Sequence, residues 1–188
     1  MAGRPTEKAR YGTLESLVEA LRDQPDDGGN LEEVFEKVAF DASELERYCL
    51  FTEAAYSRNL IARGERFELL TLCWEPGHLS PIHDHAGSDG WIRCVRGSIE
   101  EVRYRPDLSG GEPRFERLGR AELRPGQASY INDDMAWHTV GNAGASRAVS
   151  LHLYSPPIDS CQYYDARGKV VRTKVMTYYS EEGVRAGA

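Results

Sequence analysis

The stretch that decides the fold is Gly77–Gly97, GHLSPIHDHAGSDGWIRCVRG, which begins and ends on glycine and carries two histidines one residue apart. On a β-strand, side chains at positions i and i+2 face the same side, so His83 and His85 should project together while Asp84 points away. Two imidazoles on one strand face can chelate a metal when another element supplies a third ligand. His138 is the candidate third ligand. The sequence therefore predicts a metal site formed by these three histidines.

Size and composition indicate one globular domain. The chain has 188 residues, of which 40% are hydrophobic and 28% charged, which is ordinary for a soluble protein long enough to bury a core. No apolar run reaches the ~20 residues that span a bilayer. Residues 1–10 are polar and lack the apolar core of a signal peptide, so we expect a cytoplasmic protein without a membrane partner. The net charge of -7 and the lack of a basic stripe argue against nucleic acid as a partner, and we expect a monomer.

The cysteines indicate thiols rather than a disulfide framework. Cys49, Cys73, Cys94 and Cys161 stand singly, with no Cys-x-x-Cys pair among them. In a cytoplasmic protein of this size, such cysteines are typically buried or line a site.

Helices are predicted for about residues 13–50. Thr13 can cap a first helix, which should end before the breaker cluster at 24–29, and Asn30 can cap a second. A short helical piece is expected around 43–48. We expect these helices to form a small layer packed on the rest of the chain, with a packing role only. Their apolar positions at helical spacing are Leu14, Leu17, Val18 and Leu21, then Leu31, Val34, Phe35 and Val38.

From Phe67 onward the pattern changes to short strands separated by turns. Many short strands at roughly 8–12-residue spacing indicate an all-β sandwich or barrel. We favour a jelly-roll barrel over about 51–185, within a single domain that covers 1–188. The predicted strands are 67–74, 91–95, 98–105, 114–118, 121–123, 128–131, 138–140, 148–154, 161–164 and 170–179, with a loop at 106–113.

The glycine and histidine spacing of 77–97 resembles the first motif of the cupin superfamily. His138, followed four positions later by Asn142, resembles the second motif. Two departures stand out. Most metal-binding cupins place a glutamate where this chain has Gly90, and the Pro-x-Gly of the second motif is replaced here by Asn132–Asp134.

The missing glutamate changes the electrostatics of the predicted site. Three neutral imidazoles leave a divalent ion with its full charge and about three open positions if it is octahedral. Such an ion favours an anionic, soft ligand such as a thiolate, together with dioxygen, and could be Fe(II). Zinc with three histidines and a water fits the same ligands. The ligands alone therefore leave oxygenation and hydrolysis open.

Four segments together closely resemble cysteine dioxygenase, a family of cupin thiol dioxygenases. They are Tyr56–Leu60, Leu72–Trp74, Pro81–His85 and Ser150–Pro157, and the resemblance runs from about Phe51 to about Arg185. It implies an enzyme that oxidises L-cysteine to cysteine sulfinate with a mononuclear Fe(II) and both atoms of dioxygen.

The same resemblance implies roles for individual residues. Arg58 would clamp the substrate carboxylate, a task suited to its planar fork of donors. Ser150, His152 and Tyr154 share one face of a strand, so a hydrogen-bonded relay that ends at Tyr154 is physically sensible. The full set comprises the iron ligands His83, His85 and His138, the substrate-binding residues Arg58, Tyr56 and Tyr154, the catalytic residues Tyr154, His152 and Ser150, and the pocket or surrounding residues Trp74, Cys161 and Gly90.

Gly90 and Ser155 carry two further implications. Animal members of the family have, at the Gly90 position, a cysteine that is crosslinked to the tyrosine, so the resemblance implies an unmodified Tyr154, as in bacterial members. The bond between Ser155 and Pro156 matches one that is cis in the family, and X-Pro bonds adopt cis at the lowest cost.

Several alternatives remain open. A related dioxygenase acts on 3-mercaptopropionate, but those relatives carry glutamine at the Arg58 position, so Arg58 favours cysteine. A non-enzymatic cupin that binds a small ligand, and a zinc hydrolase, are rivals from other classes. Taken alone, Arg58 could pair with a surface carboxylate, and Tyr154 could be a core aromatic.

Overall fold

The computed structural model describes residues 12–24, 30–36, 39 and 41–187. Their contacts divide the chain into two compact units, one ending at Glu46 and the other beginning at Arg47. Each unit is described by itself. The single-domain organisation predicted for 1–188, and the packing of a helical layer on the barrel, therefore stay predictions.

The first unit is helical, as the apolar spacing predicts. Helix α1 (Leu14–Arg22) begins after Thr13, whose Oγ1 accepts the Ser16 amide at 3.1 Å. Asn30 Oδ1 accepts the Glu33 amide at 2.9 Å at the start of α2 (Leu31–Glu36), and Val38 lies outside the described residues. The 3-10 helix η1 (Ala42–Tyr48) ends in the second unit. No helix within the described ranges is both long and apolar enough to span a membrane.

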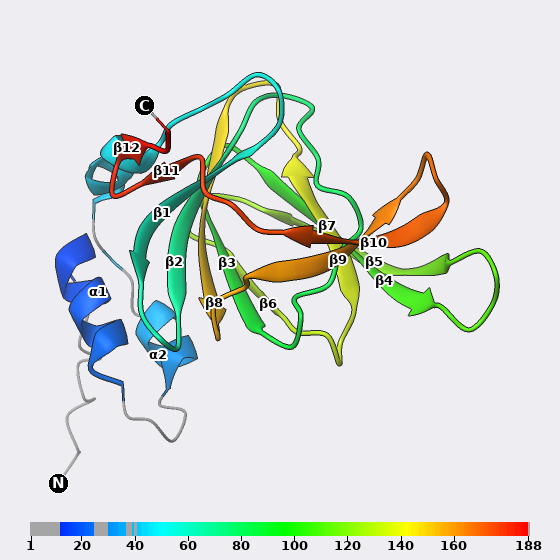
Figure 1. Ribbon diagram of the computed structural model, residues 1–188. Coiled ribbons are helices and arrows are strands. Elements are labelled where there is room, and N and C mark those ends of the chain that lie inside the picture. Colours follow the sequence, from blue (N-terminus) through cyan, green and yellow to red (C-terminus); the bar gives the residue numbers. More distant parts are fainter. Residues whose placement is uncertain (1–11, 25–29, 37–38, 40, 188) are drawn as a thin grey trace, which may run out of the picture. The chain divides into compact units, whose positions relative to one another are not determined.

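The second unit is built from strands in three sheets (Figure 1). The largest has seven strands in the order β12-β11-β1-β2-β8-β3-β6, the second has the order β5-β4-β7, and β9 pairs with β10. The strands are β1 (Ser57–Arg63), β2 (Glu68–Trp74), β3 (Asp89–Arg96), β4 (Ile99–Asp107), β5 (Arg114–Leu123), β6 (Ala128–Ile131), β7 (Trp137–Asn142), β8 (Ala148–Ser155), β9 (Ser160–Asp165), β10 (Val170–Val175), β11 (Ser180–Glu181) and β12 (Val184–Arg185).

Both larger sheets send apolar side chains into one core. Strands β1, β2, β3 and β8 contribute from one sheet, and β4, β5 and β7 contribute from the other. Alternation along each strand explains this, since every second residue faces the same side. The arrangement confirms the predicted mainly β class of jelly-roll fold.

Strand β8 lies inside the large sheet, between β2 and β3. Tyr154 is paired with Glu68 on β2 and with Gly90 on β3, while His152 is paired with Leu70 and Ile92. Tyr154 and His152 therefore each lie beside a residue of β2 and a residue of β3.

Three strand predictions were wrong in detail. Residues 114–123 form one strand rather than two, and β10 ends at Val175 rather than continuing to 179. The pairing of β5 with β4 accommodates its length through a register shift at Arg103 and Tyr104. Strand β1 was not predicted, because its buried run opens with polar Ser57, Arg58 and Asn59 and shows no alternation.

The predicted strand through His83 and His85 was also wrong. The two residues lie in the connection between β2 and β3, which forms isolated bridges only: Leu79 pairs with Gly141 of β7, and His83 pairs with His138 of β7 and with Tyr163 of β9. Isolated bridges do not make a regular strand, and His85 forms none of them.

Candidate active site

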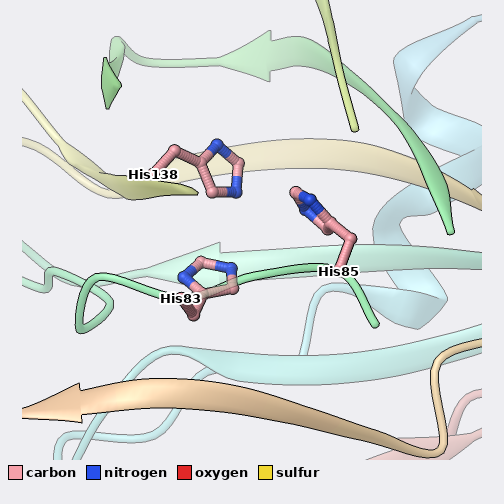
Figure 2. A group of neighbouring side chains, drawn as sticks. All are labelled: His83, His85 and His138. Carbon is pink, nitrogen blue, oxygen red and sulfur yellow. The ribbon is translucent and has the colours of Figure 1, made fainter. Parts of the chain in front are cut away.

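The three predicted metal ligands converge in one place (Figure 2). One ring nitrogen from each of His83, His85 and His138 lies within 4.8 Å of the others. The ring centroids of His138 lie 4.7 Å from those of both other histidines. His85 and His138 are buried and His83 is half-buried. The expectation that His83 and His85 project to the same side is confirmed, although they do not lie on a strand.

The ring nitrogens fit a divalent metal ion. Within the described part of the chain, neither ring nitrogen of His85 has a hydrogen-bond partner, and Nε2 of His138 also lacks one. Burial lowers the pKa of His83 to about 3 and holds the pKa of His85 well below its ordinary value. The imidazoles of His83 and His85 are therefore neutral, with lone pairs available for coordination, and buried nitrogens without partners are costly unless a ligand satisfies them.

Asp133 and Asp84 hold the segment that carries His83 and His85. Asp133 Oδ1 accepts the His85 amide at 2.7 Å, and its Oδ2 accepts the Gly87 amide at 2.6 Å. Asp84 Oδ1 accepts the Gln162 amide at 2.7 Å, so its side chain turns toward β9, away from the histidine rings. The Asn132–Asp134 stretch, which stands in place of the Pro-x-Gly of the second motif, thus contains the carboxylate that holds the segment carrying His83 and His85.

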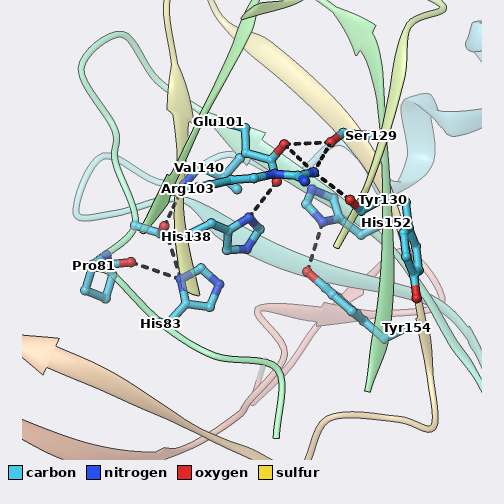
Figure 3. A network of polar contacts seen from close by, with 11 residues as sticks. Pro81, His83, Glu101, Arg103, Ser129, Tyr130, His138, Val140, His152 and Tyr154 are labelled. Atoms are coloured by element: carbon cyan, nitrogen blue, oxygen red, sulfur yellow. Dashed lines mark hydrogen bonds and ion pairs between the residues drawn. The ribbon is translucent and has the colours of Figure 1, made fainter. Parts of the chain in front are cut away.

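Glu101 stands behind His138 (Figure 3). Its Oε1 accepts a hydrogen bond from His138 Nδ1 at 2.9 Å, and both side chains are buried. Burial alone would raise the pKa of this carboxyl, but the contacts with His138, Ser129 and Arg103 lower it overall. A carboxylate therefore lies one hydrogen bond away from the histidine cluster.

Arg58 pairs with a buried carboxylate rather than with a surface one. Its Nη2 donates to Glu68 Oε1 at 3.0 Å, and the Glu68 side chain is fully buried. The other Glu68 oxygen accepts the Tyr178 hydroxyl at 2.6 Å. Burial lowers the pKa of Arg58, but Glu68 together with Tyr154, Tyr56 and Tyr178 raises it overall, so the guanidinium stays charged. Its buried Nε has no hydrogen-bond partner within the described residues.

The relay predicted on β8 is present as a chain of contacts. Trp74 Nε1 donates to Ser150 Oγ at 2.9 Å. The same oxygen lies 2.7 Å from His152 Nε2, and His152 Nδ1 lies 2.9 Å from the Tyr154 hydroxyl oxygen. Burial raises the pKa of Tyr154 above its ordinary value, so the phenol keeps its proton. Tyr56 stacks on Trp74 with ring centroids 4.6 Å apart.

One pocket brings these groups together. Nine of the predicted site residues line it, namely Tyr56, Arg58, Trp74, His83, His85, His138, His152, Tyr154 and Cys161. Ser150 lies behind His152. A side-chain carbon at Gly90 would lie 3.3 Å from the Tyr154 ring and 3.4 Å from His85 Nε2. Gly90 therefore lies next to both His85 and the Tyr154 ring. The roles of these residues stay predictions.

Glu68, Glu101 and Asp133 were not singled out from the sequence. Alternation offered a signal for two of them, because Glu68 shares a strand face with core residues Leu70 and Leu72, and Glu101 shares one with core residue Ile99. For Asp133 the sequence gives no such signal, since it lies in a connection between strands.

The fold and the site together define a cupin-type enzyme with a three-histidine metal centre. Residues 6–167 match the family model described as cysteine dioxygenase type I. The chain therefore belongs to the cysteine dioxygenase family of the cupin superfamily, and it is an enzyme of the non-haem iron dioxygenase class. The bond between Ser155 and Pro156 is cis, as the resemblance implies.

Curated relatives match almost the whole chain. Cysteine dioxygenase type 1 of Homo sapiens is 37% identical over 189 residues, which cover 96% of this chain and 92% of the human protein. The protein of the same name from Danio rerio is 37% identical over 190 residues, and that of Rattus norvegicus is 36% identical over 187 residues, with the same coverage.

Proposed function

We propose that this enzyme is an Fe(II)-dependent cysteine dioxygenase that converts L-cysteine and dioxygen to cysteine sulfinate. The observation that carries the proposal is the lining of one pocket by three metal-binding imidazoles and by Arg58, a buried cation suited to a substrate carboxylate. The family relation supports the same substrates.

The histidines would hold the metal, and Fe(II) is the proposed ion. Bound iron supplies a site where the substrate thiolate and dioxygen are brought together, so that both oxygen atoms are transferred to sulfur. His83, His85 and His138 contribute neutral nitrogen ligands. Tyr154 and Arg58 line the same pocket as these three ligands.

Arg58 would bind and orient the substrate carboxylate. Its guanidinium carbon lies 5.9 Å from the centre of the Tyr154 ring, and that ring lies 5.7 Å from the His85 ring. The cation and the metal cluster thus both lie close to one aromatic ring. This spacing supports a small amino acid whose thiol and amine face the metal while its carboxylate faces Arg58, with Tyr56 near that carboxylate.

Tyr154 would keep a proton at the reacting end of the pocket. The chain from Trp74 through Ser150 and His152 fixes the phenol oxygen, and burial keeps the phenol protonated. The hydroxyl would then donate to substrate or oxygen atoms, and the ring would exclude water. We propose that Tyr154 carries no crosslink, because Gly90 has no thiol to form one.

We further propose a cytoplasmic, monomeric enzyme folded as a single domain, with neither nucleic acid nor a membrane as a partner. The net charge of -7 supports the proposal on nucleic acid, because a phosphate backbone repels an acidic protein.

The decisive experiment measures oxygen consumption by the protein reconstituted with Fe(II), with L-cysteine and 3-mercaptopropionate compared side by side. We expect faster uptake with cysteine and a product that gains two oxygen atoms. Faster turnover of 3-mercaptopropionate would reassign the substrate. Absence of uptake, with iron confirmed in the site, would overturn the dioxygenase proposal, and metal analysis of the isolated protein would test the zinc alternative.

A further inference from the structure

Glu101 is fixed against His138 by the pairing of β4 with β7. Arg103 pairs with His138 in this ladder, and Glu101 pairs with Val140, so both side chains flank the histidine. Glu101 Oε1 lies 2.9 Å from His138 Nδ1, and each residue is only 1% exposed. The contact is therefore built into the sheet register and shielded from water.

The far oxygen of Glu101 is held just as firmly. Oε2 accepts the Ser129 hydroxyl at 2.6 Å and Arg103 Nη2 at 3.2 Å, and Arg103 Nη2 also donates to Ser129 Oγ and to the Tyr130 carbonyl (Figure 3). With both oxygens fixed, the carboxylate cannot rotate away from His138. A carboxylate only accepts, so Nδ1 of His138 donates to it, and Nε2 is the nitrogen left to coordinate a metal.

The other two histidines have no such partner. His83 Nδ1 donates to the Pro81 carbonyl at 2.9 Å, a neutral acceptor. Neither ring nitrogen of His85 has a hydrogen-bond partner in the described ranges. Gly90, where most metal-binding cupins have a glutamate ligand, contributes no charge. Among the three ligands, His138 alone is therefore backed by an anion.

We propose that Glu101 is a positioning residue that fixes the tautomer and orientation of His138 and supplies, through one hydrogen bond, the negative charge that the ligand set lacks. The proposal rests on the metal centre of the proposed function but not on the identity of the thiol. Its consequence is a tighter hold on a divalent ion than three unsupported imidazoles would give.

The test is a zinc titration of the metal-free protein against a competing chelator. E101Q keeps the shape of the side chain and removes its charge, and we expect zinc affinity to fall about 10- to 100-fold. E100Q is the matched control, since Glu100 is the preceding residue, alternation turns it to the other face of β4, and it pairs with Arg120. It should bind zinc within about twofold of the wild type.

Thermal melts distinguish the proposed role of Glu101 from a purely structural one. The metal-free E101Q and wild-type proteins should melt at similar temperatures, while the increase caused by zinc should be smaller in E101Q. A folded E101Q that binds zinc as tightly as the wild type overturns the proposal.

The tautomer can be measured without any variant. Nitrogen-15 NMR of the metal-free wild type should show His138 protonated at Nδ1, and protonation at Nε2 instead would overturn the proposal even if E101Q did not fold. Failure of the cysteine assay is a separate outcome, since zinc binding and the tautomer do not depend on the substrate.

Discussion

On the metal side of the pocket, formed by His83, His85 and His138, buried nitrogens of two rings have no hydrogen-bond partner in the described residues. On the substrate side, formed by Arg58, Ser150, His152 and Tyr154, nearly every polar group is already paired. Arg58 contacts Glu68, Tyr154 contacts His152, and His152 contacts Ser150. The Arg58 Nε is the exception.

The two sides of the pocket are therefore prepared for their ligands in different ways. The metal side presents nitrogens that a bound ion would satisfy, so it should gain stability when the ion binds. The substrate side is preorganised by the protein itself, and its cation is neutralised by Glu68 before substrate arrives. A substrate carboxylate would therefore bind a guanidinium that is already paired with Glu68, through N–H groups that Glu68 does not occupy.

The largest effect is expected on the metal side. His85→Ala should lower zinc or iron affinity by more than about 10²-fold, since changes to residues behind a ligand already cost up to that much, and oxygen uptake should fall below detection. The metal-free protein should keep its melting temperature within a few degrees, because the variant removes a buried polar group that has no partner.

His78→Ala is the matched control for that variant. His78 Nδ1 accepts the Glu75 amide at 3.1 Å, and the residue does not line the pocket. Its loss should leave metal binding unchanged. If His85→Ala strongly destabilised the metal-free protein, the proposed contrast between the two sides would be wrong.

On the substrate side, Arg58→Ala should reduce both stability and binding. It removes the nearer of the two cations of the buried Glu68 and leaves Arg63 Nη1 at 3.7 Å, which should cost about 3 kcal/mol of unfolding free energy. It also removes the carboxylate clamp, so kcat/KM for cysteine should fall roughly 10²- to 10³-fold, mainly through KM. Denaturant melts and oxygen-uptake kinetics measure the two effects.

A double variant separates these effects. In R58Q/E68Q no charge remains buried alone, so the unfolding free energy should recover substantially relative to Arg58→Ala, whereas the affinity for cysteine should not. An unchanged KM for cysteine in either variant would contradict the assignment of Arg58 as the group that binds the substrate carboxylate.

Within the same side, Tyr154→Phe should act on chemistry rather than on binding. Removing one positioned donor from the reacting end should lower kcat about 10²-fold with little change in KM. His152→Gln should act through the same hydroxyl. The double variant should then be no slower than Tyr154→Phe alone, and additive losses would argue against a shared relay.

The sequence predicted more of the substrate side than of the residues that hold the metal ligands in place. The β8 residues were predictable because Ser150, His152 and Tyr154 alternate on one strand, and the structure has that strand. The three histidines were predictable from their spacing, but the strand expected under two of them was not found. What holds those histidines, Asp133 and Glu101, depends on contacts between segments 37 to 48 positions apart in the sequence. Alternation places Glu101 on the core face of its strand, but no local pattern in a single sequence identifies the partner of either carboxylate.

The smallest effect is expected where the two sides meet, at Gly90. A methyl group there would lie 3.3 Å from the Tyr154 ring and 3.4 Å from His85 Nε2, so one neighbour must move by a few tenths of an ångström. Tyr154 is held by His152, whereas His85 has no hydrogen-bond partner on its ring within the described residues, so His85 should yield first. Gly90→Ala should therefore weaken zinc binding roughly 2- to 10-fold while the cysteine KM stays nearly unchanged.

Gly119→Ala, on β5 with nothing within 4 Å of the added carbon, is the control and should change neither value. A raised KM with normal zinc affinity would mean that the tyrosine moves more easily than the histidine, which reverses the order of rigidity inferred for the two sides.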